Sequence, residues 1–144
     1  MSAQAFAAAS ARAGLVVPIS WVERTVSTNA VLKEAVVHGV PHGTALVAGA
    51  QLGGRGRLGR TWGSPEGNLY LSVVLRPALP LAQVSLVCLA TAVAVIDVFG
   101  ADRLRIKWPN DVLSLSDHKV AGILAEAEVR GGVLDAVVVG VGIN

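Results

Sequence analysis

The sequence contains one cysteine, three histidines and few aromatic residues, and each scarcity excludes a class of structure or site. Cys88 alone can form neither an intrachain disulfide nor a cysteine-based zinc site, so we expect a small buried thiol in the apolar segment around it. The three histidines are scattered along the chain, and we predict no metal site built by the protein itself. Hydrophobic residues nevertheless make up 53% of the chain, much of it Ala and Val, which indicates a globular protein rather than a disordered one.

An excess of charge of one sign is also lacking. The chain carries 12 basic and 10 acidic residues, a balance that argues against a general nucleic-acid binder, and we expect no DNA partner. Residues 1–15 lack a basic region ahead of an apolar core, so a frayed helix is expected there rather than a secretion signal. The apolar segment 81–99 is short for a membrane span and is interrupted by polar residues. We therefore predict a buried helix there, no membrane association and a cytoplasmic protein.

The order of the expected elements predicts an α+β domain of 144 residues. Strands are expected at residues 19–24, 44–50, 69–76, 104–108, 112–115, 119–129 and 133–143. Helices are expected at residues 30–37, after the capping segment Ser27-Thr28-Asn29, and at residues 81–99. Because hairpins dominate and helices are few, we predict a mixed, mostly antiparallel sheet with helices on one face.

Six glycines and three arginines lie between residues 51 and 67, and this segment is too glycine-rich for a regular element. Its run from Gly54 to Gly59 matches G-x-G-x-x-G, but the residues that follow do not open the helix that a dinucleotide-binding fold requires. Glycine lets a backbone approach a ligand closely, and arginine offers a fixed fork of donors to phosphate oxygens. The segment therefore suits a flexible cationic clamp over a nucleotide, and its composition is equally consistent with a solvated basic loop.

Five motifs resemble those of biotin–protein ligases and follow that family's order. They are Ser27-Thr28-Asn29, the run from Gly54 to Trp62 (G-R-G-R-L-G-R-T-W), Lys107-Trp108-Pro109-Asn110-Asp111, the run from Lys119 to Leu124 (K-V-A-G-I-L), and the run from Gly140 to Asn144 (G-V-G-I-N). The resemblance extends from about residue 19 to the last residue and implies the fold shared by biotin ligases and class II aminoacyl-tRNA synthetases. Ala50 and Gly53 depart from the family's usual E-Q-T-A sequence around Gln51. No helix-turn-helix region precedes residue 19, and relatives continue beyond the position of Asn144, so we expect residues 1–144 to be a catalytic domain that is incomplete at its C-terminal end.

The resemblance also implies a reaction. Biotin and ATP, the latter with Mg²⁺, would form biotinyl-5′-adenylate, and the biotin would then pass to a lysine of a biotin carboxyl carrier protein domain, in acetyl-CoA carboxylase or a related carboxylase. A homodimer is left open. Two other functions remain compatible with the sequence: a lipoate ligase or octanoyltransferase of the same fold, and a non-catalytic module that binds biotin or a carrier domain.

Site residues carried over from the family motifs fall into three groups. The catalytic group is Lys119, Arg55 and Arg57. The biotin-binding group is Ser27, Thr28, Asn29, Gln51, Gly54, Arg55, Arg57, Lys119, Gly122 and Leu124. The ATP-binding group is Arg57, Arg60, Trp62, Asn110, Asp111, Lys119 and Asn144.

Most of these residues also have a purely structural interpretation. Ser27 or Thr28 suits a helix N-cap, Lys119 a surface position after a turn, and Asn110 and Asp111 a turn between strands. Trp62 suits either adenine stacking or a buried anchor for the glycine–arginine loop, and Gly122 and Leu124 suit a core strand. We expect Trp108 in the core. We also expect residues 51–64 to be mobile without ligand and ordered over the adenylate.

Overall fold

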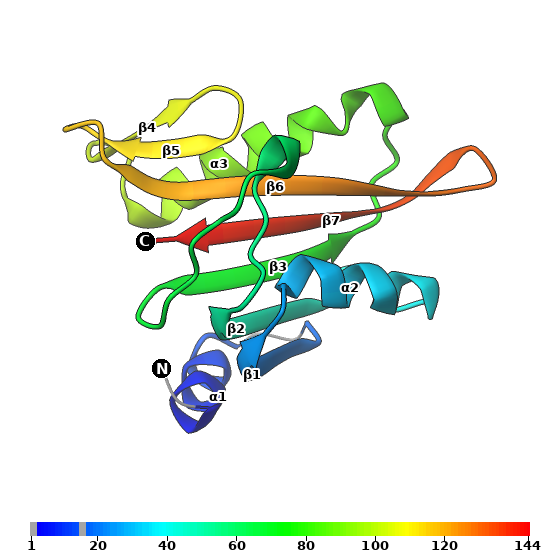
Figure 1. The fold of residues 1–144 in the computed structure, drawn as a ribbon, viewed down its shortest axis with the longest axis horizontal. Helices are drawn as coiled ribbons and strands as arrows, with labels where there is room; N and C mark the ends of the chain where they lie inside the picture. The colour runs from blue at the N-terminus through cyan, green and yellow to red at the C-terminus, as the bar shows by residue number, and fades with distance from the viewer. Residues whose placement is uncertain (1–2, 15–16) are drawn as a thin grey trace.

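The computed structural model describes residues 3–14 and 17–144, and its strands form one mixed sheet (Figure 1). The strands are β1 (Ile19–Thr25), β2 (Ala45–Gln51), β3 (Leu69–Leu75), β4 (Leu104–Lys107), β5 (Asp111–Ser114), β6 (Lys119–Arg130) and β7 (Val133–Ile143). Their order across the sheet is β1-β2-β3-β7-β6-β5-β4. Among the described strands, β1 and β2 pair in parallel and every other neighbouring pair is antiparallel. The predicted mixed, mostly antiparallel sheet is confirmed.

The longest hairpin joins β6 to β7 through Gly131 and Gly132, as the sequence predicts. Both glycines have positive φ, 59° and 80°. A two-residue turn of this kind matches the twist of the flanking strands, and glycine is the residue that adopts it without strain.

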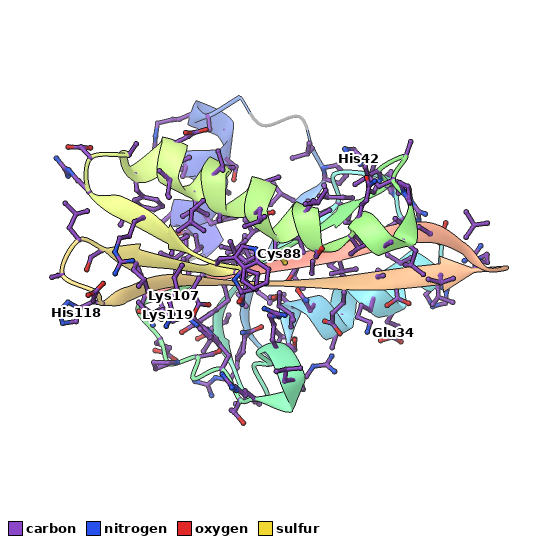
Figure 2. All side chains as sticks on the ribbon, turned by 90° about the horizontal axis from the view of Figure 1, so that it is seen from above. Glu34, His42, Cys88, Lys107, His118 and Lys119 are labelled. Carbon is purple, nitrogen blue, oxygen red and sulfur yellow. The ribbon has the colours of Figure 1, made fainter. Side chains whose placement is uncertain are left out.

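The helices lie on both faces of the sheet, so the prediction of helices on one face is wrong. They are α1 (Ala3–Arg12), α2 (Thr28–Val37) and α3 (Ser85–Phe99), with the short turns η1 (Arg57–Gly59) and η2 (Leu81–Gln83). Viewed from above, α1 and α3 lie on one side of the sheet, and α2 and η1 lie on the other (Figure 2). The central strand β7 is apolar on both sides, which is typical of a strand covered on both faces.

Two clusters of buried residues correspond to these two faces. On β7, Ala136 and Val138 pack with Leu32 and Val36 of α2. The alternate residues of β7 pack with α3; they are Val137, Val139 and Val141. Cys88 of α3 lies in this second cluster, as the sequence predicts, and burial raises the pKa of its thiol (Figure 2).

The helix predicted over residues 81–99 is present as η2 and α3, but it is buried on one side only. Val87, Cys88, Ala92 and Val95 are buried, whereas Val98 is 78% exposed. Within the described residues, Leu81–Phe99 is the helical stretch long and apolar enough to cross a membrane by length and composition, and 22% of that window is buried. A helix that packs on the outside of a sheet leaves its outer side in solvent, and an apolar composition alone does not reveal this.

Trp108 is 76% exposed, so its predicted place in the core is wrong. It follows Lys107, the last residue of β4, in the turn to β5 at one edge of the sheet. At this edge, no further strand of the described residues lies beside β4 to cover the indole. The N-terminal helix predicted over residues 1–15 is present as α1, and the described residues 13 and 14 lie after its end. Residues 1, 2 and 15 of the prediction lie outside the described residues. Phe6 of α1 stacks on Trp21 of β1 with ring centroids 5.6 Å apart.

Candidate active site

A cavity of about 240 Å³ lies on the α2 side of the sheet, between the N-terminus of α2, the strands β6 and β7, and the glycine–arginine loop, residues 54–62. Most residues that the sequence assigns to the site line this cavity. They are Thr28, Asn29, Gln51, Arg55, Arg57, Arg60, Trp62, Asn110, Asp111, Lys119, Gly122 and Leu124. Three assigned residues do not line it: Ser27, Gly54 and Asn144.

The glycine–arginine loop folds back on itself instead of opening a helix. Arg55 and Thr61 form an isolated antiparallel bridge, and the Trp62 amide donates to the Gly54 carbonyl at 2.9 Å. The Gly56 amide donates to the Arg60 carbonyl at 2.7 Å, which closes the tip around η1. The loop thereby presents Arg55, Arg57 and Arg60 to one cavity.

Trp62 attaches this loop to the sheet. Gly122 of β6 and Gly142 of β7 are cross-strand partners, and the indole of Trp62 occupies the space above them. A Cβ atom on Gly122 would lie 2.7 Å from Trp62 Cζ3, and one on Gly142 would lie 2.5 Å from Trp62 Nε1. Side chains larger than hydrogen at these two positions would therefore displace the indole. The Nε1 donor is buried without a hydrogen-bond partner in the described structure.

Positive charge gathers at one end of the cavity. Lys119 Nζ lies 2.7 Å from Asp111 Oδ1 and 4.8 Å from the centroid of the Trp62 ring. Arg57 donates to Asn110 Oδ1 at 3.2 Å, and Asn110 in turn donates to the Ile123 carbonyl at 3.0 Å. Lys119 and Arg57 are the cations that these contacts hold at this end. Together with Arg55 and Arg60, which also line the cavity, they outnumber its single carboxylate, so the cavity suits an anion.

Neutral polar groups occupy the other end, where α2 begins. Gln51 Oε1 accepts from the Thr28 amide at 2.8 Å and lies 3.2 Å from Thr28 Oγ1. Gln51 Nε2 donates to Ser64 Oγ at 3.0 Å, which fixes the orientation of the carboxamide. Ser72 is fully buried, and its hydroxyl oxygen lies 2.6 Å from both Thr28 Oγ1 and Asn29 Oδ1.

The polar groups at the neutral end also contact a charged pair, Glu126 and Lys33. Glu126 accepts from Asn29 Nδ2 at 2.8 Å and from Lys33 Nζ at 2.9 Å. Burial alone would raise the pKa of Glu126, but hydrogen bonds from Asn29 and Lys33 outweigh it and hold that pKa below its ordinary value. The hydrogen bond to Glu126 raises the pKa of Lys33. The pair therefore remains ionised over a wide pH range.

Ser72, Ser64 and Glu126 belong to the site although the sequence motifs did not point to them. Ser72 is a polar residue at a buried position of the largely apolar strand β3. Glu126 lies two residues after Leu124 on β6, so both side chains lie on the same face of the sheet. A polar residue on the buried side of a strand is the signal that would have identified Ser72 and Glu126, whereas Ser64 lies outside the strands and has no such signal.

The three assigned residues outside the cavity have structural positions. Ser27 caps α2 by accepting from the Ala30 amide at 3.4 Å. Gly54 lets the two ends of the loop lie close together, because a Cβ atom there would lie 2.5 Å from Ser64 Oγ. Asn144 donates from its side chain to the Lys119 carbonyl at 3.1 Å and lines a separate cleft with Trp21 and Phe99.

Comparison with known proteins identifies relatives of this chain. The model of the biotin/lipoate A/B protein ligase family matches residues 21–144. A biotin–[acetyl-CoA-carboxylase] ligase of Paracoccus denitrificans is 48% identical over 130 residues, which cover 84% of this chain and 52% of that protein.

Two solved structures are similar to this one. The biotin protein ligase of Aquifex aeolicus in complex with biotin and ATP matches with a TM-score of 0.67 and 40% identity, over 88% of this chain and 51% of that one. The biotin protein ligase of Leishmania major in complex with biotinyl-5-AMP matches with a TM-score of 0.69 and 33% identity, over 88% of this chain and 56% of that one. The chain thus spans about half the length of each of these three relatives.

Proposed function

The chain belongs to the biotin/lipoate A/B protein ligase family, and from that premise we propose that it activates biotin with ATP and transfers it to a lysine of a carrier protein. The observation that carries the proposal is the division of one cavity into a neutral polar end and a cationic end. Biotin has the same division: a neutral ureido ring at one end and a carboxylate at the other.

The neutral end receives the ureido ring in this proposal. The ring offers two N–H donors and one carbonyl acceptor, and Thr28 and Gln51 supply oxygen acceptors and an amide donor at this end. Gly122 and Leu124 border the path toward Lys119, along which the valeryl chain would run.

The cationic end carries out the first step. The biotin carboxylate attacks the α-phosphorus of ATP, a bond forms between carboxylate oxygen and phosphorus, and pyrophosphate leaves. Two anions approach each other in this step, so Lys119 is placed between them to offset their repulsion and to stabilise the charge of the transition state. Arg57 and Arg60 hold the phosphates, and Trp62, Asn110 and Asp111 complete the nucleotide side.

The second step joins biotin to the acceptor. The ε-amine of a lysine attacks the carbonyl carbon of the biotinyl-adenylate, an amide forms, and AMP leaves with its electron pair. Arg55 and the rest of the glycine–arginine loop cover the mixed anhydride until the lysine arrives, which limits hydrolysis by water. We propose a biotin carboxyl carrier protein domain as the acceptor.

Magnesium would enter this site with ATP. The described residues contain no cluster of three or more His, Cys, Asp or Glu side chains that holds a metal on its own. One carboxylate beside a phosphate site is sufficient, since Mg²⁺ is commonly bound by one or two carboxylates together with substrate phosphates. Asp111 is the residue that fits, and the ion would neutralise charge on the phosphates.

The proposal is tested by measuring which acid this chain activates with ATP. ATP–pyrophosphate exchange would be measured with biotin, lipoate and octanoate, each at saturating concentration. We expect exchange with biotin and exchange at least about tenfold slower with the other two acids, which lack the ureido donors. Exchange with lipoate or octanoate but not with biotin would contradict the proposed substrate, and binding of biotin without any exchange would indicate a non-catalytic module.

A further inference from the structure

Four polar side chains, here called the Glu126 chain, contact one another in the order Glu126, Asn29, Ser72 and Thr28, and Thr28 lines the cavity. Asn29 Nδ2 lies 2.8 Å from Glu126 Oε2 and 3.4 Å from the Leu124 carbonyl oxygen. Both neighbours accept hydrogen bonds and neither donates, so the amide nitrogen must face them. Asn29 Oδ1 therefore faces Ser72, and a flipped amide would set its oxygen against the carboxylate.

The positions of the hydroxyl protons follow from this orientation. Asn29 Oδ1 only accepts, so the proton in its 2.6 Å contact with Ser72 comes from the Ser72 hydroxyl. That hydroxyl has one proton, so the proton in the 2.6 Å contact between Ser72 and Thr28 comes from Thr28. If Ser72 donated to Thr28 instead, the 2.6 Å contact between Ser72 and Asn29 Oδ1 would have no proton. The longer contact of 3.2 Å, between Thr28 Oγ1 and Gln51 Oε1, is the one left without a proton.

Two acceptor oxygens then stand side by side at the neutral end of the cavity. Gln51 Oε1 cannot turn away, because Gln51 Nε2 donates to Ser64 and Oε1 accepts from the Thr28 amide. Thr28 Oγ1 cannot donate, because its proton is committed to Ser72. An N–H group of a ligand placed between these oxygens would satisfy both, whereas an oxygen atom there would be repelled by both.

We propose that Glu126 is a positioning residue that sets the direction of this hydrogen-bond chain and thereby makes the cavity select a ligand with an N–H donor at Thr28 and Gln51. The inference rests on the proposed function, in which the ureido N–H of biotin is that donor. Glu126 does not line the cavity and acts through Asn29 and Ser72. Lys33 supports the role, since its ion pair keeps the carboxylate charged and turned toward Asn29.

The test compares two variants and a matched control. Glu126→Gln replaces a carboxylate, which can only accept a hydrogen bond from Asn29, with an amide that can also donate one. Ser72→Ala removes the hydroxyl at the centre of the Glu126 chain. Glu128→Gln is the control, because Glu128 lies 3.3 Å from the same Lys33 Nζ but has no hydrogen bond to Asn29. Binding of biotin and of two cyclic carbamate analogues, each with a ring oxygen in place of one ureido N–H, would be measured by calorimetry, and circular dichroism would establish that each variant is folded.

We expect the unaltered chain and Glu128→Gln to bind biotin about 10-fold to 100-fold more tightly than at least one carbamate. In Glu126→Gln and in Ser72→Ala that ratio falls by about tenfold or more, because Thr28 becomes free to donate. A folded Glu126→Gln variant with the same ratio as Glu128→Gln would overturn the inference, and so would an unaltered chain that binds biotin and both carbamates equally. If the unaltered chain bound no biotin, the proposed function itself would be wrong and the inference with it.

Discussion

Lys119 is the residue on which the proposed chemistry depends most. Its ammonium is paired with Asp111 and lies 4.8 Å from the centroid of the Trp62 ring, so these contacts hold it at the cationic end of the cavity although its side chain is 40% exposed. Removing one preorganised charge of this kind from a transition state costs about 10²–10³ in rate. We therefore expect Lys119→Ala to lower biotin-dependent ATP–pyrophosphate exchange by that factor at saturating biotin.

Arg103→Ala is the control for this change. Arg103 is an exposed cation just before β4 and does not line the cavity. Its removal changes the overall charge equally, and we expect exchange within about twofold of the unaltered rate, as for surface changes in general. Equal rates for Lys119→Ala and the unaltered chain would exclude Lys119 from catalysis.

The ion pair of Glu126 and Lys33 predicts how stability depends on pH. Because the folded pKa of Glu126 lies below the ordinary value of 4.5, the carboxylate stabilises the fold above that pH, and the contribution is lost as the pH falls through the folded value. A protonated Glu126 resembles glutamine in charge. The difference in free energy of unfolding between the unaltered chain and Glu126→Gln should be largest near pH 7 and should shrink below pH 4.5. Urea unfolding at pH 7, 5, 4 and 3 would measure it, and a difference independent of pH would contradict the assignment.

The glycine–arginine loop is attached to the sheet through Trp62, and Gly142 is the position that tests this attachment. A Cβ atom at Gly142 would lie 2.5 Å from Trp62 Nε1, so Gly142→Ala must push the indole out of its slot. Overpacking of this kind typically costs about 1–3 kcal/mol, and we expect Trp62 to become more exposed, with a red shift of tryptophan emission. Gly63→Ala, directly after the loop, is the control, because a Cβ atom there meets nothing within 4 Å. Equal emission and stability of the two variants would show that Trp62 does not anchor the loop.

Ligands should change how accessible this loop is. Arg55, Arg57 and Arg60 are exposed around the tip, where like charges repel each other until an anion binds between them. We expect trypsin to cleave after these arginines in the free chain, and biotin together with ATP to slow that cleavage about tenfold or more. Cleavage at the same rate with both ligands bound would contradict closure of the loop over the adenylate.

At the level of whole elements, the strands were predictable and the placement of the helices was not. Each strand is a β-prone segment bounded by turn residues, and β7 runs over residues 133–143 in both prediction and structure. The face of the sheet that a helix covers depends on the side of β7 against which the helix packs. The segment that forms α3 is mostly apolar on all its sides, so its sequence does not indicate which face it covers. Trp108 shows the same limit, since its burial depends on whether any layer extends over the edge of the sheet.

Within the site, the sequence predicted the residues that the family motifs contain and missed those that support them. Thr28, Gln51 and Lys119 come from three separate segments and meet in one cavity. Ser72 and Glu126 carry no motif, and their importance arises from contacts with Asn29 that only the folded sheet creates. Asn144 follows Ile143, the last residue of β7, and its side-chain amide donates to the Lys119 carbonyl, so its assignment to the nucleotide stays a prediction.

The molecule as a whole is built on one sheet (Figure 1). A polar cavity lies on the α2 side of this sheet, and the apolar helix α3 packs on the opposite side. The central claim is that this cavity, as the 144-residue chain forms it, joins biotin to AMP. The most direct measurement is a single-turnover reaction of excess chain with biotin and ATP labelled at the α-phosphorus, followed by rapid filtration and chromatography. We predict labelled biotinyl-adenylate that depends on biotin and remains in the protein fraction. Labelled ATP recovered unchanged, under conditions where calorimetry shows that biotin and ATP are both bound, would contradict the claim.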